Sequence, residues 1–357
     1  MKGFGAGFRN RNPLVLVVAA VLLVPALLGF EYLFSSGAWS GVPLKFWMRK
    51  ASDDYTYVSW TVGANKQDPP KTPAVYLLGG STAREAITSG DSLAAEIERL
   101  GGPKVSAWDL GSMNQNFAQS LAIADNVPNS PTWILIGLNV GRFTPDRGAS
   151  MQQVVGRELL LKSAFLQQYV AREYGKYKYN RTILPGIFSF LVSWATVHGP
   201  ELQKGSIPSR EYGQHRYNQR SMHTPAQKER MVRIWNKRRY RKFKRHLAFN
   251  LAMLEQLVIR CQERGLHPVL LELPNDRDLI GERLDYAAVQ YQEPAQALAG
   301  KYDVPYVDFN QELDLKNADF HDLSHLVEPG RVIWQHRLAQ ELAQLMGAGA
   351  NGAGTAP

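Results

Sequence analysis

Three side chains in this sequence have the types that nucleophilic catalysis needs. Ser81 follows a short apolar run that ends at two glycines, in AVYLLGGSTARE over residues 74–85. Asp322 and His325 stand three residues apart in ADFHDLSHL, over residues 318–326. A serine hydroxyl becomes a strong nucleophile when an imidazole takes its proton and a carboxylate holds that imidazole in the correct tautomer. The set predicts acyl transfer, with Ser81 as nucleophile, His325 as base and Asp322 as the orienting acid.

Ser81 also suits two other roles. A glycine-rich turn can hold a phosphate, but LLGGSTAREA contains neither G-x-x-x-x-G-K-[ST] nor G-x-G-x-x-G, so both nucleotide fingerprints fail. A serine at this position can equally cap a following helix. The choice between cap and nucleophile depends on whether His325 and Asp322 lie beside Ser81 in the fold.

The segment around His325 holds other acids and bases. Asp319 and His321 compete with Asp322 and His325 for the catalytic roles. His321 and His325 are four residues apart, so a metal site that includes Asp322 is a second interpretation. We favour the interpretation without a metal, because the segment reads as a loop and we find no third ligand cluster at a distance in the sequence. The sequence therefore predicts no metal and no cofactor.

Short apolar runs alternate with amphipathic stretches along most of the chain. Runs typical of strands buried on both faces occupy residues 74–78, 105–110, 132–138, 268–273 and 305–309. Helical patterns occupy residues 93–100 with Asp91 as cap, 117–123, 247–264, 286–298 and 332–346. We expect an α/β fold, a three-layer flavodoxin-like parallel sheet with helices on both faces. Ser81 and His325 then share the carboxyl edge of the sheet, where open α/β sheets bind ligands.

Four blocks in chain order resemble those of the SGNH (GDSL-like) hydrolase superfamily, over about residues 73–346. They are Gly79-Gly80-Ser81, Asp109-Leu110-Gly111-Ser112, Gly137-Leu138-Asn139 and Asp322-Leu323-Ser324-His325. The resemblance implies the SGNH fold and a triad of Ser81, Asp322 and His325. It also implies an oxyanion hole made by the amides of Ser81 and Gly111 with the side chain of Asn139.

The match has departures and local alternatives. Gly80 and Val140 stand where the family often has aspartate. Taken alone, Asn139 could simply end a strand, and Gly111 could only form a tight turn. An α/β-hydrolase fits less well, because Gly79-Gly80-Ser81-Thr82-Ala83 lacks the last glycine of G-x-S-x-G.

The amino terminus carries the strongest apolar signal. Residues 14–30 (LVLVVAAVLLVPALLGF) form a run of 17 uncharged residues. As a helix the run is about 26 Å long, close to a bilayer core of roughly 30 Å once Tyr32 to Phe34 join it. Lys2, Arg9 and Arg11 precede the run, so the positive-inside rule leaves the amino terminus in the cytoplasm. We interpret it as an uncleaved anchor, with a signal peptide cleaved near Ser36-Gly37-Ala38 as the alternative.

Length and composition are those of a globular protein behind such an anchor. The chain has 357 residues, is 45% hydrophobic and contains one cysteine, Cys261, in an apolar helical pattern. One cysteine excludes an intramolecular disulfide framework and a cysteine-based metal cluster. The predicted divisions are a cytoplasmic tail (1–12), a transmembrane anchor (13–34), a linker and domain edge (35–72), an SGNH-like domain (73–346) with an insertion (141–245) over the strand ends, and a disordered tail (347–357).

Positive charge is concentrated in one segment. Residues 228–245 contain ten Lys or Arg against one acid, which leaves 31 basic and 31 acidic residues in the remainder. The segment is either a solvated helix face or a contact for anionic lipid head groups or an anionic polymer. An exported domain would not meet nucleic acid, so we expect none as a partner.

Together these features predict a single-pass protein of the cytoplasmic membrane, with its amino terminus inside and its domain periplasmic or extracellular. It resembles the exported proteins of alginate and peptidoglycan O-acetylation and of D-alanyl transfer to teichoic acid. That resemblance implies a serine esterase or O-acyltransferase acting on a cell-surface or extracellular polysaccharide or wall polymer, with a membrane-bound O-acyltransferase as partner. The alternative, motivated by Gly80 and Val140, is a catalytically inactive SGNH-fold protein that binds polysaccharide or assembles an export or modification complex.

Overall fold

Five parallel strands form the predicted sheet, in the order β2-β1-β3-β4-β5. This is the flavodoxin-like order, in which the first strand lies inside the sheet. The strand bounds are β1 (Ala74–Leu78), β2 (Ser106–Asp109), β3 (Thr132–Leu138), β4 (His267–Glu272) and β5 (Tyr306–Val307). The computed structural model describes residues 13–49, 53–129, 131–154, 159–175, 183–201 and 222–352, so the predicted cytoplasmic tail lies outside the described residues.

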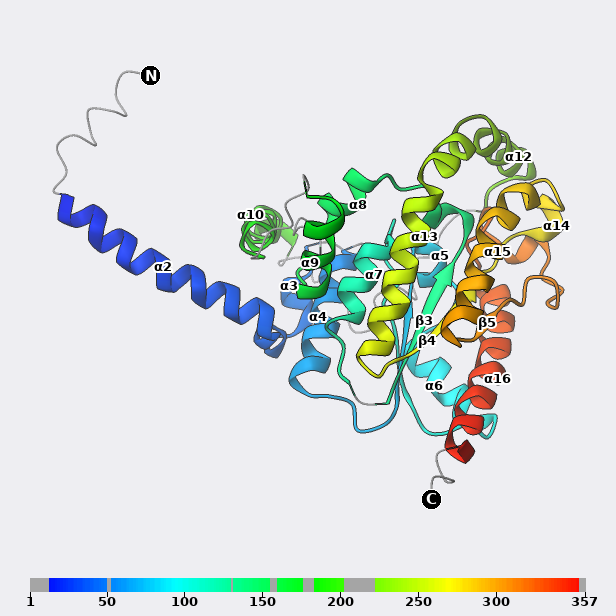
Figure 1. The fold of residues 1–357 in the computed structure, drawn as a ribbon, viewed down its shortest axis with the longest axis horizontal. Coiled ribbons are helices and arrows are strands. Elements are labelled where there is room, and N and C mark those ends of the chain that lie inside the picture. The colour runs from blue at the N-terminus through cyan, green and yellow to red at the C-terminus, as the bar shows by residue number, and fades with distance from the viewer. Residues whose placement is uncertain are drawn as a thin grey trace.

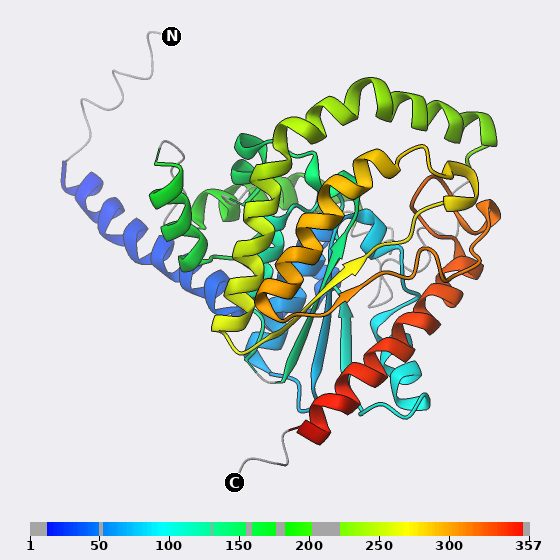
Figure 2. The same cartoon turned by 45° about the vertical axis from the view of Figure 1, so that its right-hand side comes forward.

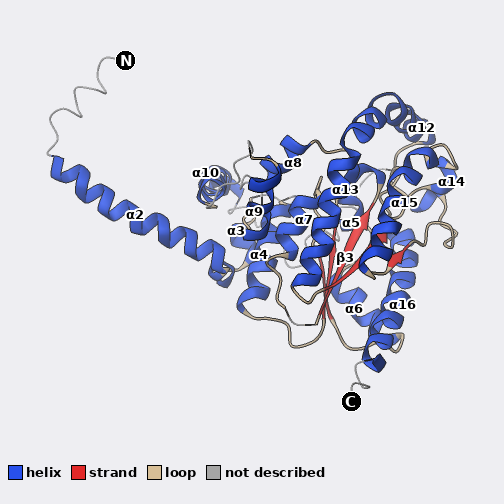
Figure 3. Cartoon of the chain, in the orientation of Figure 1, coloured by secondary structure: helices blue, strands red, loops and turns tan. Residues whose placement is uncertain are grey.

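Helices cover both faces of the sheet, because alternate side chains of a strand point to opposite sides (Figures 1 and 3). Tyr76 and Leu78 of β1 enter one core, whereas Val75 and Leu77 enter the other. The first core is closed by α4 (Asp54–Gln67), α7 (Phe117–Ala124), α13 (Tyr240–Glu263) and α15 (Asp285–Tyr302). The second is closed by α6 (Gly90–Arg99) and α16 (Glu328–Gly352), which Figure 2 shows side by side. The α/β prediction is therefore confirmed.

Several helix ends differ from the sequence prediction for local reasons. Helix α6 is capped by Ser89, whose hydroxyl accepts from the Ser92 amide at 3.0 Å, so the expected cap Asp91 lies in the first turn instead. Helix α13 begins at Tyr240, inside the basic segment, because α12 (Pro225–Ile234) continues into it through a π-helical turn, η4 (Trp235–Arg239). Helix α16 runs through residues 347–352 of the expected tail, and 353–357 lie outside the described residues.

Other elements complete the fold. They are the 3₁₀ turns η1 (Ala38–Gly41), η2 (Val140–Phe143) and η5 (Asn317–Asp319), and the helices α3 (Leu44–Trp47), α5 (Ser81–Arg84), α8 (Arg147–Val154), α9 (Ala164–Glu173), α10 (Leu184–Glu201) and α14 (Arg277–Ile280). Cys261 is buried in the first core, as predicted, and burial raises the pKa of its thiol to about 12.

The apolar amino-terminal run forms one helix, α2 (Pro13–Ser36), which extends away from the sheet (Figure 1). Its span Val17–Ser36 has a mean hydropathy of 2.2 and only 6% of it is buried, so it is long and apolar enough to cross a membrane. This part of the localisation prediction is confirmed.

The end of α2 packs against α4, η1 and α10. Phe34 is buried in an aromatic cluster with Trp39 and Phe190, although we had expected it to flank the membrane span. The Glu31 carboxylate accepts from the Ile183 amide at 2.9 Å. The apolar stretch of the insertion therefore packs on the end of the anchor, where its aromatic residues find their partners, and the position of the insertion over the strand ends stays a prediction.

A buried carboxyl group in the core gives a test of this fold. Glu272, at the end of β4, accepts hydrogen bonds from Tyr291 and Tyr306, both at 2.7 Å, and burial raises its pKa to about 8. The folded protein holds this proton to a higher pH than the unfolded chain, so stability is lost as pH rises from about 5 toward 8, by up to about 1.4 kcal/mol per pH unit. We expect Glu272→Gln to reduce this slope in denaturant unfolding of the detergent-solubilised chain. The exposed Glu263→Gln is the control, and an equal slope in both variants would contradict the assignment.

Candidate active site

Ser81 is the first residue of α5, directly after β1. Strand β1 ends at Leu78, and the two glycines that follow turn the chain into the helix. A Cβ atom on Gly79 would lie 2.5 Å from that of Ala83, so only glycine lets α5 pack this closely on the strand end. The apolar run and its glycines thus place the hydroxyl of Ser81 at the carboxyl edge of the sheet.

His325 and Asp322 reach the same edge from the loop between β5 and α16. His325 Nε2 lies 2.8 Å from Ser81 Oγ. His325 Nδ1 lies 2.8 Å and 2.9 Å from the two carboxylate oxygens of Asp322. The structure therefore brings together the three residues that the sequence singled out, in the order hydroxyl, imidazole, carboxylate. This arrangement lets the imidazole take the hydroxyl proton while the carboxylate steadies the resulting positive charge.

The surroundings of Asp322 keep its carboxylate ionised. Burial alone would raise its pKa, but the hydrogen bond and charge of His325 oppose this, as do the amides of Ser324 and His325, each 3.0 Å from Oδ1. The net effect holds the pKa of Asp322 well below its usual range. Asp322 therefore acts as an acceptor for His325 Nδ1, which leaves Nε2 as the nitrogen that can receive the proton of Ser81.

Two buried cations fix the loop that carries His325. Arg331, on α16, donates to the carbonyl of Glu85 after α5 at 3.0 Å and to that of Leu326 at 3.1 Å, so one side chain joins the serine and histidine segments. Lys228, on α12, donates at 2.9 Å to Asp276 and to the carbonyl of Phe320. Sequence analysis assigned Lys228 to the basic surface segment, but the folded chain buries it.

The expected oxyanion donors Gly111 and Asn139 follow the two strands that flank β1. The register pairs Leu77 with Asp109 of β2 and Leu78 with Ile136 of β3. Past the end of β2, the Ser112 amide donates to the Gly79 carbonyl at 3.0 Å, which keeps the Gly111 turn beside the glycines that precede Ser81. The Gly111 amide donates to Asp109 at 2.8 Å, so it is engaged within the protein. A Cβ atom there would lie 2.5 Å from the Arg84 amide, which explains the glycine by close packing.

Asn139 is oriented by the turn that follows β3. Its side-chain oxygen accepts from the Arg142 amide at 3.1 Å, and its amide nitrogen makes no hydrogen bond within the described residues. The Arg142 side chain is buried, donates to the Gly137 carbonyl at 2.5 Å and lies over the Phe117 ring. Nothing in the sequence pattern marks Arg142 as the support of this turn.

The other acids and bases of the loop have different partners. Asp319 accepts from the Lys316 amide at 2.8 Å and so closes the turn η5. His321 is grouped with Asp322 and with His223, a residue that sequence analysis did not consider, and one potential ligand atom of each lies within 4.8 Å of the others. The metal interpretation made from the sequence combined His321 and Asp322 with His325, whereas His325 contacts Ser81.

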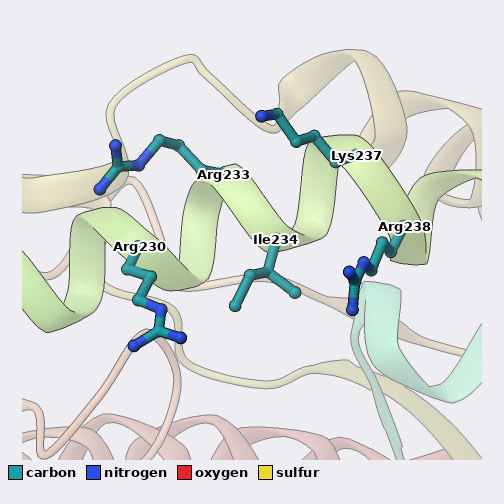
Figure 4. Close-up of a pocket in the computed structure, with 5 residues that line it drawn as sticks. All are labelled: Arg230, Arg233, Ile234, Lys237 and Arg238. Carbon is teal, nitrogen blue, oxygen red and sulfur yellow. The ribbon is translucent and has the colours of Figure 1, made fainter.

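The basic segment forms an open hollow on α12 and η4 (Figure 4). The hollow has a volume of about 400 Å³ and is lined by Arg230, Arg233, Ile234, Lys237 and Arg238. These four cations form no ion pair with a carboxylate among the residues that the structure describes. We name this surface the basic hollow.

Comparison with known proteins adds little. No protein-family model matches the chain, and no curated protein matches it. Among solved structures, the crystal structure of protein YXIM from Bacillus subtilis is similar at a TM-score of 0.37 and 11% identity, covering 78% of this chain and 58% of that one. The chain thus spans little more than half the length of that protein.

Lys228 should be essential to the stability of the loop. We expect Lys228→Met to lower the free energy of unfolding by about 3–5 kcal/mol, because it leaves the buried Asp276 carboxylate without its cation. The matched control is Lys237→Met on the exposed part of the same segment, with a change within about 0.5 kcal/mol. Denaturant unfolding of the detergent-solubilised chain measures both. Equal losses would show that the buried ion pair has no special role.

Proposed function

We propose that this protein is a membrane-anchored serine esterase or O-acyltransferase that works through an acyl-serine. The observation that carries the proposal is the continuous contact from Ser81 through His325 to Asp322, at 2.8 Å for each step. A serine that only capped a helix would have no need of an imidazole backed by a carboxylate. The buried cations that hold the loop also support the proposal, because a catalytic hydroxyl and base must be held in fixed positions.

The proposed reaction has two half-steps. Ser81 Oγ attacks the carbonyl carbon of an ester while His325 Nε2 takes its proton. The tetrahedral intermediate then expels the alcohol, which receives that proton, and the acyl group remains on Ser81. A water molecule or a sugar hydroxyl, deprotonated by His325, then attacks the acyl-serine. The acyl group leaves as a carboxylic acid or as a new sugar ester, and His325 returns the proton to Ser81 Oγ. Water gives an esterase and a sugar hydroxyl gives an acyltransferase.

The oxyanion of each step would be held by nearby donors. The amide of Ser81 is the first of α5, and such amides have no partner within their helix. The Asn139 side chain has a nitrogen available, whereas Gly111 would have to exchange Asp109 for the oxyanion. One donor of this kind contributes about 3 kcal/mol to the transition state. We therefore assign the hole to Ser81 and Asn139, with Gly111 as the third donor.

We propose a polysaccharide or wall polymer with anionic groups as the substrate. The support is the basic hollow, which lies on the helix that Lys228 joins to the site loop. The hollow is far from α2 in the fold (Figure 1), so it is better placed for a polymer than for lipid head groups next to the anchor. A membrane-bound O-acyltransferase that supplies the acyl group would be a natural partner of the transferase form.

The anchor is proposed to stay attached, with the domain on the outer side of the cytoplasmic membrane. Gly37, at the alternative cleavage site, has φ +88° and packs on Gly63 of α4, where a Cβ atom would lie 2.6 Å from the Gly63 carbonyl oxygen. A peptidase site built into the domain in this way is poorly accessible. The attachment of Phe34 and Glu31 points in the same direction.

The catalytic proposal is tested with a fluorophosphonate probe, which reacts with activated serines. We expect the wild-type chain to be labelled, Ser81→Ala not to be labelled, and Asp322→Asn to react slower by about four orders of magnitude, because the wrong tautomer of His325 is then favoured. Ser193→Ala on α10 is the control and should react like the wild type. A folded wild-type chain that takes no label would support the inactive, polymer-binding alternative.

The topology is tested with a reporter that is active only outside the cytoplasm, fused to the carboxyl end of the full chain. We expect an active reporter, because Lys2, Arg9 and Arg11 favour retention of the amino terminus in the cytoplasm. The same fusion without residues 2–36 should be inactive. Activity from a reporter that works only in the cytoplasm would reverse the proposed orientation.

A further inference from the structure

Two imidazoles and a carboxylate converge beside the candidate active site. One ligand atom each of His223, His321 and Asp322 lies within 4.8 Å of the other two. Backbone bonds hold this group together: the His223 amide donates to the His321 carbonyl at 2.9 Å, and the His321 amide donates to the His325 carbonyl at 2.7 Å. The ring centroids of the two histidines are 4.6 Å apart. The main chain thus holds the two histidines side by side, and Asp322 follows His321 directly in the chain.

The ring of His223 has a buried atom that the protein leaves unused. Its Nδ1 is inaccessible to solvent and makes no hydrogen bond to any residue that the structure describes. Buried polar atoms are nearly always satisfied, and an exception calls for a water molecule or an ion. A metal ion in contact with this nitrogen would satisfy it.

The set of ligands favours one class of ion. Two neutral imidazoles and one carboxylate are the ligands of open zinc sites, which keep a fourth position for water or another ligand. We propose that His223, His321 and Asp322 bind a divalent transition-metal ion of the Zn²⁺ type, and that the bound ion slows the reaction of Ser81. The second half of this proposal rests on the proposed function; the binding itself does not.

The shared ligand explains why the ion would inhibit. Both oxygens of Asp322 lie within 2.9 Å of His325 Nδ1, so the carboxylate serves the imidazole in the absence of metal. A cation on Asp322 takes up part of its negative charge and competes for the same oxygens. Metal binding and base catalysis therefore compete for Asp322.

The test uses the full chain in detergent, carrying no histidine tag and stripped of metal with EDTA. Zn²⁺ is titrated by calorimetry, and the rate of fluorophosphonate labelling is compared with and without saturating Zn²⁺. We expect one tight site in the wild type and labelling slower by about tenfold or more with the metal. His223→Asn should lose the tight site, and its labelling rate should become independent of Zn²⁺. The control is His267→Asn, at the start of β4 and so at the edge of the sheet away from the site. This variant should keep the tight Zn²⁺ site and the slower labelling with Zn²⁺.

Each result separates the two parts of the proposal. Absence of a tight site in the wild type, or a tight site that His223→Asn leaves unchanged, overturns the metal site. A second outcome is that His223→Asn loses the tight site while Zn²⁺ does not change the labelling rate of the wild type. That result supports the metal site and overturns the inhibition. A wild type that takes no label in either condition is a failure of the proposed function, and calorimetry still decides the site. If His223→Asn does not fold, His223→Gln replaces it, and a rise in the wild-type unfolding temperature with Zn²⁺ gives independent support for binding.

Discussion

The arrangement of the candidate site depends on a loop that must cross the sheet edge. Ser81 follows an inner strand, whereas His325 follows β5 at the margin, with β3 and β4 between them. At the usual strand spacing this separation is about 14 Å, which no imidazole can span by itself. The chain between β5 and α16 makes the crossing, and Arg331 fixes its far end by binding carbonyls of both segments. The contact between serine and histidine is therefore a property of the whole carboxyl edge.

Two buried cations hold the carboxyl edge of the sheet together, and burial also shifts the pKa of a nearby acid. Burial removes the charged groups of Lys228 and Arg331 from water. Hydrogen bonds to several acceptors, mostly main-chain carbonyls, offset the desolvation free energy of each cation. Beneath the site, burial raises the pKa of Asp109 to about 7, although the Gly111 amide and the charge of Arg84 act against it. Because Asp109 holds that amide, its protonation state and the availability of the expected third oxyanion donor are linked.

The sequence predicts the sheet well for a physical reason, and the structure places Ser81, His325 and Asp322 in contact. Strands buried on both faces must be apolar throughout, so β1 and β3 are visible as short runs with the predicted bounds. Turn glycines and hydroxyl, acid and base residues then mark the ends of those runs. The family resemblance added the spacing that selects Asp322 over Asp319, and the contacts of both carboxylates agree with that choice.

What the sequence could not predict depends on contacts between distant segments. Lys228 has the composition of a solvated helix face, and only the fold shows that it points inward at Asp276. His223 precedes the basic segment with no motif around it, so its position beside His321 has no local signal. The position of α10 also has no local signal in the sequence. Its apolar residues could equally cover the strand ends or join the aromatic cluster on α2, and the structure shows the cluster.

The junction between α2 and the domain has a consequence for where the protein can work. The carbonyls of Ser35 and Ser36, at the end of α2, accept hydrogen bonds from Lys66 and Gln67 of α4 at 3.0 Å and 2.7 Å, so the helix is attached directly to the domain. With the apolar helix in a bilayer, this attachment would keep the domain in a fixed orientation and Ser81 at a fixed distance from the membrane surface. Under the proposed function, the site would reach a polymer close to the membrane surface and would not reach one farther away. A flexible insert at the junction would let the domain reach farther from the membrane, and the site would no longer be confined to the membrane surface.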